Sequence, residues 1–239
     1  WGDHFARWNE LLERCDYVGV RGPHAARLLL ENGFSRARVI GDPYLALEPP
    51  MPYRPEEKLL GINLGSTNDS QLGGSEQEFF DFMTDLLKQL KADGWRFLWL
   101  SVWSKDLPIL RRLHDLIGDD GPLLDARVDG LEALSRLSQC RLFLGEKLHA
   151  CAMAAVAGVP FIALEYQPKV RDFAGSVGME DWVVSTAVRD RDELLHRIEK
   201  AVAKSEALSS QMTSRVQRNR SDIYEFAWKI RNYYAEKEV

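Results

Sequence analysis

The chain has 239 residues, of which 45% are hydrophobic and 28% are charged, a composition typical of a globular protein with a sizeable core. Its formal net charge of −5 excludes a chain-wide positive field for nucleic acid or an anionic membrane, so any anion-binding site must be local. Three cysteines, no apolar run of about 18 residues and no secretory leader favour a soluble, cytoplasmic chain with reduced thiols. Residues 5–15 have the pattern of a helix interior, so we expect further sequence before Trp1.

Short apolar runs alternate with amphipathic segments along the chain. The runs that predict strands are 17–20, 37–40, 59–64, 95–102, 140–145, 160–165 and 181–184. Helices are predicted over 24–32, 75–92, 105–117, 130–138, 147–157, 168–177, 190–206 and about 211–236. Most of the strand runs lack polar alternation, which is typical of parallel strands buried on both faces. This order predicts an α/β fold, a doubly wound, mostly parallel, Rossmann-like sheet with a long C-terminal helix.

The proline-rich stretch EPPMPYRPEE, residues 48–57, is the best candidate for a linker. It would separate residues 1–47, interpreted as the tail of a preceding Rossmann-like domain, from a Rossmann-like binding domain over 58–210. Residues 211–239 would form a helix that packs back on the fold, because their apolar side chains recur at helical spacing.

Lys147 and His149 lie where the strand CRLFLG, residues 140–145, meets the next helix. In open α/β sheets, ligands bind beyond the carboxyl ends of the strands, where unpaired N–H groups of helix N-termini attract anions. A cation in the first helical turn opposes the helix dipole by about 0.3–1 kcal/mol unless an anion lies nearby. We therefore predict an anion-binding turn that begins at Gly145. The structural alternative is a solvated lysine and a hydrogen-bonded histidine, and proximity alone gives Glu146 no role.

Arg21 lies at a second strand end, followed by Gly22, which allows a tight turn, and by Pro23, which suits a first helical position. Its guanidinium could hold a carboxylate or phosphate through two hydrogen bonds, or pair with a neighbouring acid on the surface. The residues themselves leave both interpretations open. We expect His24 to begin a helix rather than to catalyse a reaction.

The segment GINLGSTNDSQLGGSE, residues 61–76, contains a polar loop that could close over a substrate with its N–H groups. Asn63, Gly65 and Ser66 are its candidate site residues. Asp106, after another strand, is either a site residue or a helix cap. The loop matches neither a P-loop nor a dinucleotide-binding fingerprint. The chain also lacks GxSxG, CxxC and HExxH motifs and carboxylates at metal spacing, so no metal site is predicted.

Together, these strand ends resemble the polysaccharide pyruvyltransferase family. Its most diagnostic segment has the form G-x-R-L-H-A, an apolar helix, G-V-P and then Y-x-P-K. Here that segment reads LGEKLHACAMAAVAGVPFIALEYQPKV, residues 144–170. An upstream V-R segment, a helix and a D-P pair are matched by VRGPHAARLLLENGFSRARVIGDPYL, residues 20–45. The resemblance covers most of residues 15–185.

The resemblance implies a two-domain fold like that of the GT-B glycosyltransferases, with this chain as the carboxy-terminal, donor-side half. It implies a transferase that moves a pyruvyl group from phosphoenolpyruvate to a sugar of a cell-surface glycan or its lipid-linked precursor, as in exopolysaccharide biosynthesis. Phosphoenolpyruvate would be a co-substrate, with no cofactor, metal or nucleic acid implied. The acceptor would bring the protein near the cytoplasmic face of the membrane.

By the same resemblance, Arg21 and His149 would be the donor-binding pair, with Lys147 in place of the family's arginine. Gly145 and Lys169 fall in the matched segment and would line the donor site. Ketal formation requires a proton for the enol carbon and a deprotonated sugar hydroxyl, which is acid–base work that suits His149. Whether His149 is the catalytic acid or a phosphate ligand stays open.

Lys147 departs from the family pattern because the point charge of its ammonium replaces the planar guanidinium of the family's arginine. His24 stands where the family often has a small hydroxyl residue, and Gly22 where it often has an acid. These departures imply an altered donor preference or lost catalysis. One alternative is a GT-B nucleotide-sugar glycosyltransferase, although many of those carry a carboxylate in the helix that reads ACAMAAVAG here. A second alternative is a non-catalytic glycan- or partner-binding domain.

Overall fold

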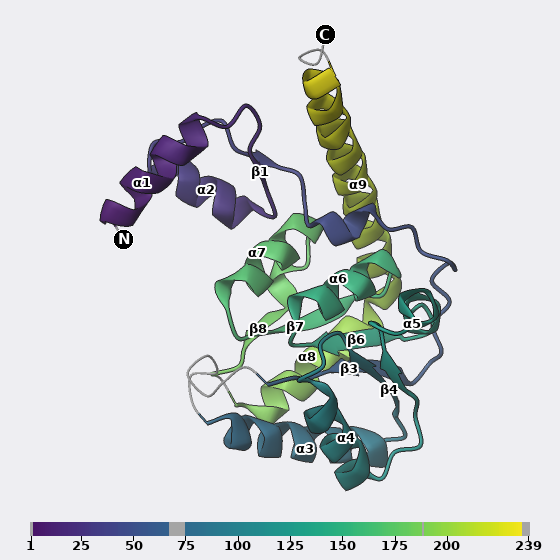
Figure 1. Ribbon diagram of the computed structural model, residues 1–239. Helices are drawn as coiled ribbons and strands as arrows, with labels where there is room; N and C mark the ends of the chain where they lie inside the picture. Colours follow the sequence, from purple (N-terminus) through teal and green to yellow (C-terminus); the bar gives the residue numbers. More distant parts are fainter. Residues whose placement is uncertain (1, 67–74, 188, 236–239) are drawn as a thin grey trace.

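The computed structural model describes residues 2–66, 75–187 and 189–235 (Figure 1). A sheet with strand order β5-β4-β3-β6-β7-β8 lies at the centre of this part of the chain, and each neighbouring pair is parallel. Its strands are β3 (Leu59–Asn63), β4 (Arg96–Ser101), β5 (Leu123–Asp125), β6 (Leu142–Gly145), β7 (Phe161–Glu165) and β8 (Val183–Ser185). The predicted parallel α/β sheet is confirmed.

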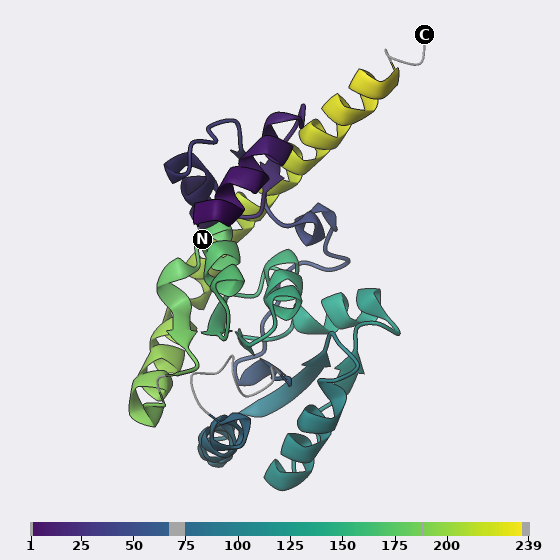
Figure 2. The same ribbon diagram turned by 60° about the vertical axis from the view of Figure 1, so that its left-hand side comes forward.

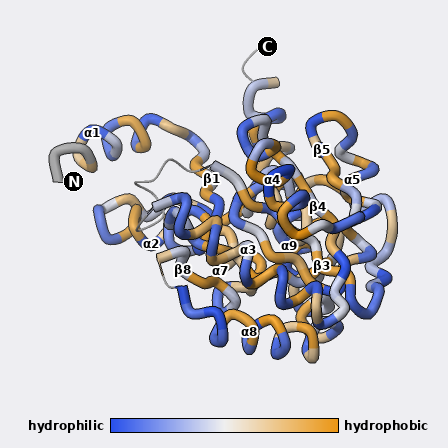
Figure 3. The backbone as a smooth tube through the Cα atoms, turned by 90° about the horizontal axis from the view of Figure 1, so that it is seen from below, coloured by the Kyte–Doolittle hydropathy of each residue, from blue (hydrophilic) through white to orange (hydrophobic). Residues whose placement is uncertain are grey.

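Helices cover both faces of the sheet (Figures 1 and 2). One face carries α3 (Glu76–Ala92), α4 (Leu107–Ile117) and α8 (Arg191–Ala203), and the other carries α5 (Gly130–Leu137), α6 (Leu148–Val156) and α7 (Pro168–Val177). In Figure 3, α8 alternates between hydrophobic and hydrophilic stretches, as an amphipathic surface helix does. The arrangement is therefore doubly wound, as predicted.

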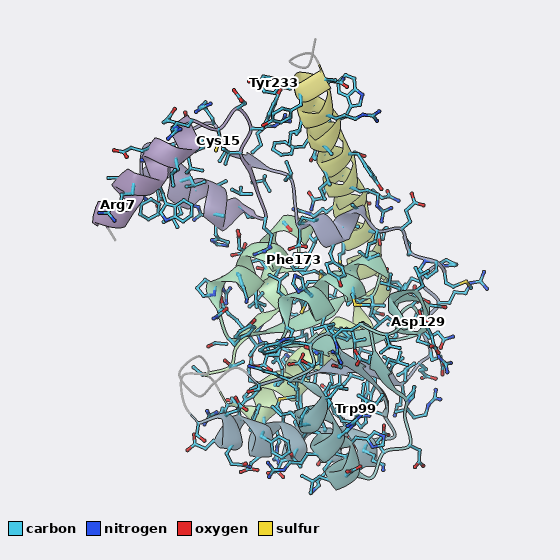
Figure 4. The ribbon with its side chains drawn as sticks, viewed as in Figure 1. Arg7, Cys15, Trp99, Asp129, Phe173 and Tyr233 are labelled. Carbon is cyan, nitrogen blue, oxygen red and sulfur yellow. The ribbon has the colours of Figure 1, made fainter. Side chains whose placement is uncertain are left out.

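Side chains of each central strand alternate between two cores, because successive residues of a strand point to opposite faces. In β6 and β7, Phe143 and Phe161 pack toward α5, α6 and α7, whereas Leu144 and Ile162 pack toward α3, α4 and α8. Phe173 and Trp99, labelled in Figure 4, belong to these two cores. Both faces are apolar, which explains why the sequence shows unbroken apolar runs.

The N-terminal segment forms a small parallel pair of strands beside two helices. Its elements are α1 (Gly2–Glu13), β1 (Gly19–Val20), α2 (Pro23–Glu31) and β2 (Arg38–Val39), followed by the 3-10 turn η1 (Pro43–Ala46). The long helix α9 (Ser205–Ala235) runs from the sheet to this segment (Figure 1). There, Tyr17 makes edge-on contacts with Phe226 and Tyr233, with ring centroids 5.9 and 5.8 Å apart.

The structure differs from the sequence prediction most clearly at β5 and α9. Strand β5 was not predicted, because it has three half-buried residues at the edge of the sheet and no long apolar run. Helix α9 begins at Ser205 rather than at about 211, directly after the C-cap of α8 at Lys204.

Residues 48–57 contain no helix or strand, but the proposed division into domains stays a prediction. None of the helices in the described ranges is long and apolar enough to cross a bilayer. Residues 67–74 of the polar loop lie outside the described residues.

The start of α2 is capped by a carboxylate from α7. Asp172 Oδ1 accepts hydrogen bonds from the N–H groups of His24 at 2.8 Å and Ala25 at 3.2 Å. A Cβ atom at Gly22 would lie 2.2 Å from the Asp172 carbonyl oxygen, so only glycine permits this approach. Asp172 therefore fixes the residues after Arg21 against α7.

We expect Asp172→Ala to lower the free energy of unfolding by about 0.5–2 kcal/mol, because two N–H groups at the start of α2 lose their acceptor. Denaturant titration followed by circular dichroism measures this change. Asp172→Asn is the matched control, since its amide oxygen can still accept, and it should stay close to the wild type. Equal losses in both variants would contradict the capping role.

Candidate active site

The turn between β6 and α6 is held by one buried amide. Asn63, fully buried at the end of β3, accepts hydrogen bonds from Glu146 N–H at its carbonyl oxygen (3.0 Å) and from Lys147 N–H at Oδ1 (2.9 Å). Its Nδ2 donates to Leu100 O in β4 at 2.8 Å. Asn63 therefore ties three strands to the predicted anion-binding turn, and its own polar atoms have partners within the protein.

Two of the predicted site glycines allow close packing around this turn. A Cβ atom at Gly65 would lie 1.9 Å from Asp106 Oδ1 and 2.6 Å from Lys147 Cε. A Cβ atom at Gly145 would lie 2.5 Å from Phe143 Cε1. The absence of a side chain at position 65 is thus what lets a lysine and an acid approach each other at the strand ends.

Lys147 is the N-cap residue of α6, and its side chain is only 10% exposed. Its Nζ donates to the Ser66 carbonyl oxygen at 2.8 Å and lies 4.0 Å from Asp106 Oδ1. The same ammonium lies 4.8 Å from the ring centroid of Tyr166 and 5.8 Å from that of Trp103, within range of cation–π attraction. Lys147 is therefore held in place on several sides rather than solvated.

Five of the predicted residues line one cleft of about 460 Å³, which we call the cationic cleft. Its described lining consists of Arg21, Ser66, Val102, Trp103, Lys147, Leu148, His149, Tyr166, Gln167 and Lys169. No carboxylate occurs in this set, whereas Arg21, Lys147 and Lys169 supply a guanidinium and two amino groups beside the His149 imidazole. The cleft thus concentrates positive charge in a chain whose net charge is negative.

The N-termini of α6 and α7 both face the cationic cleft, since Lys147 and Gln167 are their N-caps. Neither N-cap side chain hydrogen-bonds to the helix that it precedes. The first N–H groups of a helix, together with its dipole, attract anions. The cleft therefore has two sources of positive potential besides its cationic side chains.

Arg21 follows β1 and reaches the cleft while pairing with an acid. Its Nε donates to Asp42 Oδ2 at 2.7 Å, and Asp42 Oδ1 accepts from Tyr44 N–H at 3.0 Å. Asp42 is only 3% exposed, so this pair fixes the orientation of the guanidinium. The ion pair is confirmed, with a buried acid, whereas the role of Arg21 as a site residue stays a prediction that its position in the cleft allows.

Lys169, in the first turn of α7, lies with its Nζ 5.2 Å from the Tyr166 ring centroid. Partial burial, and then the positive charge of Arg21, lower the pKa of Lys169. The Tyr166 ring thus contacts the ammonium groups of both Lys147 and Lys169. Crowding of like charges at these positions is relieved by a bound anion.

His149 is exposed at the mouth of the cleft, although every other residue of α6 is buried. Its ring stacks on Tyr44, with centroids 5.2 Å apart and planes at 27°. This contact restrains the imidazole while leaving it accessible to a substrate, which a general acid or base requires.

Two acids lie buried behind Lys147. Asp106 has 0% exposure, and neither of its carboxylate oxygens has a well-formed hydrogen bond to a residue that the structure describes. Glu146 has 1% exposure; its Oε2 accepts from Gly65 N–H at 2.8 Å, and its Oε1 has no partner within the same described ranges. Burial raises the pKa of Asp106 to about 6, although Lys147 opposes the shift. Burial likewise raises the pKa of Glu146 to about 7, again against the effect of Lys147.

Asp106 is the N-cap residue of α4, as the sequence allowed, yet its side chain makes no capping hydrogen bond. The sequence analysis gave Glu146 no role and did not single out Tyr166 or Trp103. Each directly follows or lies close behind a strand end, which is the signal that could have identified them. The described residues contain no cluster of three or more side chains suited to hold a metal ion.

A model of the family described as "Polysaccharide pyruvyl transferase" matches residues 4–168, more than half of the chain. The chain belongs to the polysaccharide pyruvyl transferase family. The match includes Arg21, Lys147 and His149 and ends one residue before Lys169. A search of curated proteins finds no match.

Comparison with solved structures finds glycosyltransferase-like neighbours at low sequence identity. One is a mutant of S. aureus TarM in complex with fondaparinux, alpha-GlcNAc-glycerol and UDP, with a TM-score of 0.55 and 13% identity over 91% of this chain and 44% of that chain. Another is the glycotransferase of kitacinnamycin, with a TM-score of 0.47 and 15% identity over 78% of this chain and 46% of that chain. The TarM likeness shows the expected GT-B-like fold, and this chain spans less than half the length of either structure.

Asp106→Asn tests the buried acid through stability. Because the folded-state pKa lies above the ordinary value of 3.8, the folded protein binds more protons than the unfolded chain, and wild-type stability falls as pH rises between these values. The asparagine imitates the protonated acid, so we expect the variant to be more stable by up to roughly 3 kcal/mol above about pH 7 and to match the wild type near pH 4. Thermal unfolding across this pH range measures the difference.

Asp129→Asn is the control for this experiment. Asp129 is also an N-cap residue, but it accepts a hydrogen bond from Glu132 N–H at 2.8 Å, a role that asparagine can keep. Its melting temperature should stay close to that of the wild type at every pH. A loss of stability in Asp106→Asn at high pH would show that the charged form of Asp106 stabilises the fold.

Proposed function

We propose that the cationic cleft binds phosphoenolpyruvate and that this chain is the donor-binding half of an enzyme that transfers its pyruvyl group to a sugar. The product would be a cyclic ketal on a cell-surface glycan or its precursor. The proposal is supported most directly by the convergence of Arg21, Lys147 and Lys169 with two helix N-termini in a cleft without a described carboxylate. That the chain belongs to the polysaccharide pyruvyl transferase family supports the same reaction class.

Phosphoenolpyruvate carries a phosphate and a carboxylate, so its site needs several cationic donors. Asp42 engages Nε of Arg21, so the two terminal nitrogens of the guanidinium are the atoms that would face an oxyanion. Lys147 and Lys169 supply point charges at the starts of α6 and α7, beside the N–H groups of those helices. A volume of about 460 Å³ leaves room for part of a sugar ring beside this small donor.

His149 is suited to the acceptor hydroxyl because it is exposed at the mouth of the cleft and restrained by Tyr44. In the proposed reaction, each of two sugar hydroxyls forms a bond to C2 of the donor and loses its proton. C3 gains a proton to become a methyl group, and the phosphate leaves. An imidazole that takes up a hydroxyl proton supplies general-base catalysis for this addition.

A nucleotide-sugar glycosyltransferase is the second candidate, because the TarM structure has the same fold and contains UDP. Against it, α6 contains no carboxylate that could hold a ribose, and all its residues except His149 are buried. A non-catalytic binding domain is the third candidate and requires a glycan or partner to bind without turnover.

The first prediction for this proposal concerns donor affinity. We expect calorimetry to show binding of phosphoenolpyruvate that weakens as salt concentration rises. Arg21→Met and Lys169→Met should each weaken binding roughly 10-fold or more, because a hydrogen bond to a charged group contributes about 1.5–3 kcal/mol. Arg27→Met, which changes an exposed arginine of α2 outside the cleft, should bind like the wild type. Tight binding of UDP-sugars with none of phosphoenolpyruvate would favour the second candidate.

The second prediction concerns turnover by the full-length protein. His149→Ala should lower the rate of phosphate release from phosphoenolpyruvate by about 10²–10⁴-fold, the usual contribution of a general acid or base. A panel of p-nitrophenyl glycosides supplies the acceptor, and mass spectrometry identifies the ketal product. His196→Ala, on the exposed face of α8, is the control. An unchanged rate in His149→Ala would leave the histidine with only a structural role.

A further inference from the structure

We infer that Lys147 is the acid that protonates the methylene carbon of the donor, and that Asp106 is the buried group that returns a proton to Lys147. This inference rests on the proposed function, because it requires phosphoenolpyruvate in the cationic cleft. Lys147 would then be a catalytic residue, and Asp106 a positioning and proton-supplying residue that acts through it.

The position of the Lys147 ammonium supports this role. Nζ lines the cationic cleft, although the side chain is only 10% exposed. One hydrogen goes to the Ser66 carbonyl oxygen at 2.8 Å, and Asp106 Oδ1 lies behind the nitrogen at 4.0 Å. An ammonium has three hydrogens. The Ser66 bond takes one, so others remain to reach a ligand in the cleft and the acid behind it.

The charge balance behind Lys147 indicates a stored proton. One ammonium faces two buried carboxyl groups. Asp106 Oδ1, Asp106 Oδ2 and Glu146 Oε1 make no well-formed hydrogen bond within the described residues, although weaker hydrogen bonds from Asn63 and Trp103 lower the pKa of Asp106 somewhat. Burying an ionised carboxylate without hydrogen bonds is costly, so a group in this position tends to keep its proton. The raised pKa values of both acids, about 6 and about 7, agree with a cluster that holds a proton near neutral pH.

Other charged groups set the field around this cluster. The Asp106 carboxyl feels Lys147 and Arg127, and the Glu146 carboxyl feels Lys147, Asp106 and Glu76. Behind Lys147 lie the carboxyl groups of Asp106, from the start of α4, and of Glu146, from the same turn as Lys147. The Tyr166 ring, after β7, contacts the ammonium. The other titratable groups of the cleft lining are Arg21, His149 and Lys169. Acids therefore lie behind the ammonium and bases or cations lie in front of it. The cations in front oppose movement of a proton toward the cleft, so the transfer requires the negative charge of bound phosphoenolpyruvate to offset them.

A lysine can do what an arginine at this position cannot. A guanidinium remains protonated at any physiological pH, whereas a buried ammonium can give up a proton and regain it. The replacement of the family's arginine by Lys147 then adds a proton donor rather than removing a phosphate ligand. His149 remains available to take the proton of the acceptor hydroxyl.

The electron pair of the C2–C3 double bond takes a proton from Lys147 Nζ, and the sugar oxygen bonds to C2 as its own proton passes to His149. Asp106 then gives its proton to the Lys147 amine. The second hydroxyl displaces phosphate at C2, and its proton leaves with the phosphate. His149 releases its proton to solvent, and Asp106 is reprotonated from solvent when the products leave.

The test compares Lys147→Arg with Lys105→Arg in the full-length protein. Lys105 is exposed, and its Nζ lies 5.0 Å from the ring centroid of the same Trp103, so it controls for a local change of cation. We expect Lys147→Arg to bind phosphoenolpyruvate within a few-fold of the wild type but to lose about 10²–10⁴-fold in kcat. The rate at which deuterium from heavy water enters the product methyl group should fall in parallel. Lys105→Arg should match the wild type in all three measurements.

Two further variants separate proton transfer from structure. Lys147→Ala should regain part of its rate with added ethylamine, which can donate a proton, but not with added guanidine, which cannot. Asp106→Asn should keep its donor affinity while changing the alkaline limb of the kcat–pH profile, because the supply of protons to Lys147 is lost.

The outcomes are distinguishable. Wild-type turnover and an unchanged pH profile in Lys147→Arg would overturn the inference while leaving the proposed function intact, as would equal rescue of Lys147→Ala by both additives. A wild-type protein that neither binds phosphoenolpyruvate nor releases phosphate from it would overturn the proposed function and the inference together. If Lys147→Arg unfolds, the rescue experiment decides alone.

Discussion

The buried amide of Asn63 is the interaction on which the geometry of the candidate site depends. It joins the end of β3 to β4 and to the turn before α6, and all of its bonds lie inside the protein. A hydrogen bond in this low-dielectric setting is costly to break, because a buried polar group would be left without a partner. The backbone of Lys147 is consequently as well fixed as the strands themselves. Its long side chain passes close to Gly65, where a Cβ atom would lie 2.6 Å from Lys147 Cε, and reaches the cleft.

The cationic cleft and the acids behind it illustrate how position separates charges of opposite sign. The cleft side presents Arg21, Lys169 and the N-termini of α6 and α7, whereas the interior side holds Asp106 and Glu146. Lys147 contacts both regions, because its side chain lines the cleft and its Nζ lies 4.0 Å from Asp106 Oδ1. Its ammonium is attractive to an anionic ligand in front and to carboxyl groups behind. The chemistry of the site therefore depends on whether the Lys147 ammonium interacts mainly with a ligand in the cleft or with the buried carboxyl groups.

Much of the fold could be predicted from the sequence because the strands are buried on both faces. Runs such as LLGIN and FIALE leave little choice of secondary structure, and the helices between them show clear apolar stripes. Strand β5 has no such signal, since an edge strand of three half-buried residues depends on pairing with β4. Lys147, His149 and Lys169 were predictable for a related reason: they follow strands that end at the same edge of the six-stranded parallel sheet. Arg21 instead follows β1 of the separate two-stranded sheet, and only the fold brings it to the cleft.

The buried acids could not be predicted in the same way. Glu146 lies beside Lys147 in the sequence, but its burial depends on the hydrogen bond to Gly65, 81 residues away. Asp106 has the sequence context of a helix cap, and only the packing against Gly65 turns its side chain inward. Long-range contacts of this kind leave no local pattern. The same is true of Tyr166, whose ring contacts two lysines from different helices.

The carboxylate of Asp172 has a consequence for ligand binding. Asp172 belongs to α7, the helix that begins with Lys169 in its first turn, and it holds the first turn of α2 directly after Arg21. Arg21 and Lys169, which are far apart in the chain, are thereby connected through hydrogen bonds between α7 and the start of α2. A ligand that engages both would find them already arranged and would not have to order the segment between them. The free energy spent on ordering protein segments during binding is small in such a preorganised site. A modest number of contacts can then suffice to bind a ligand as small as a three-carbon acid.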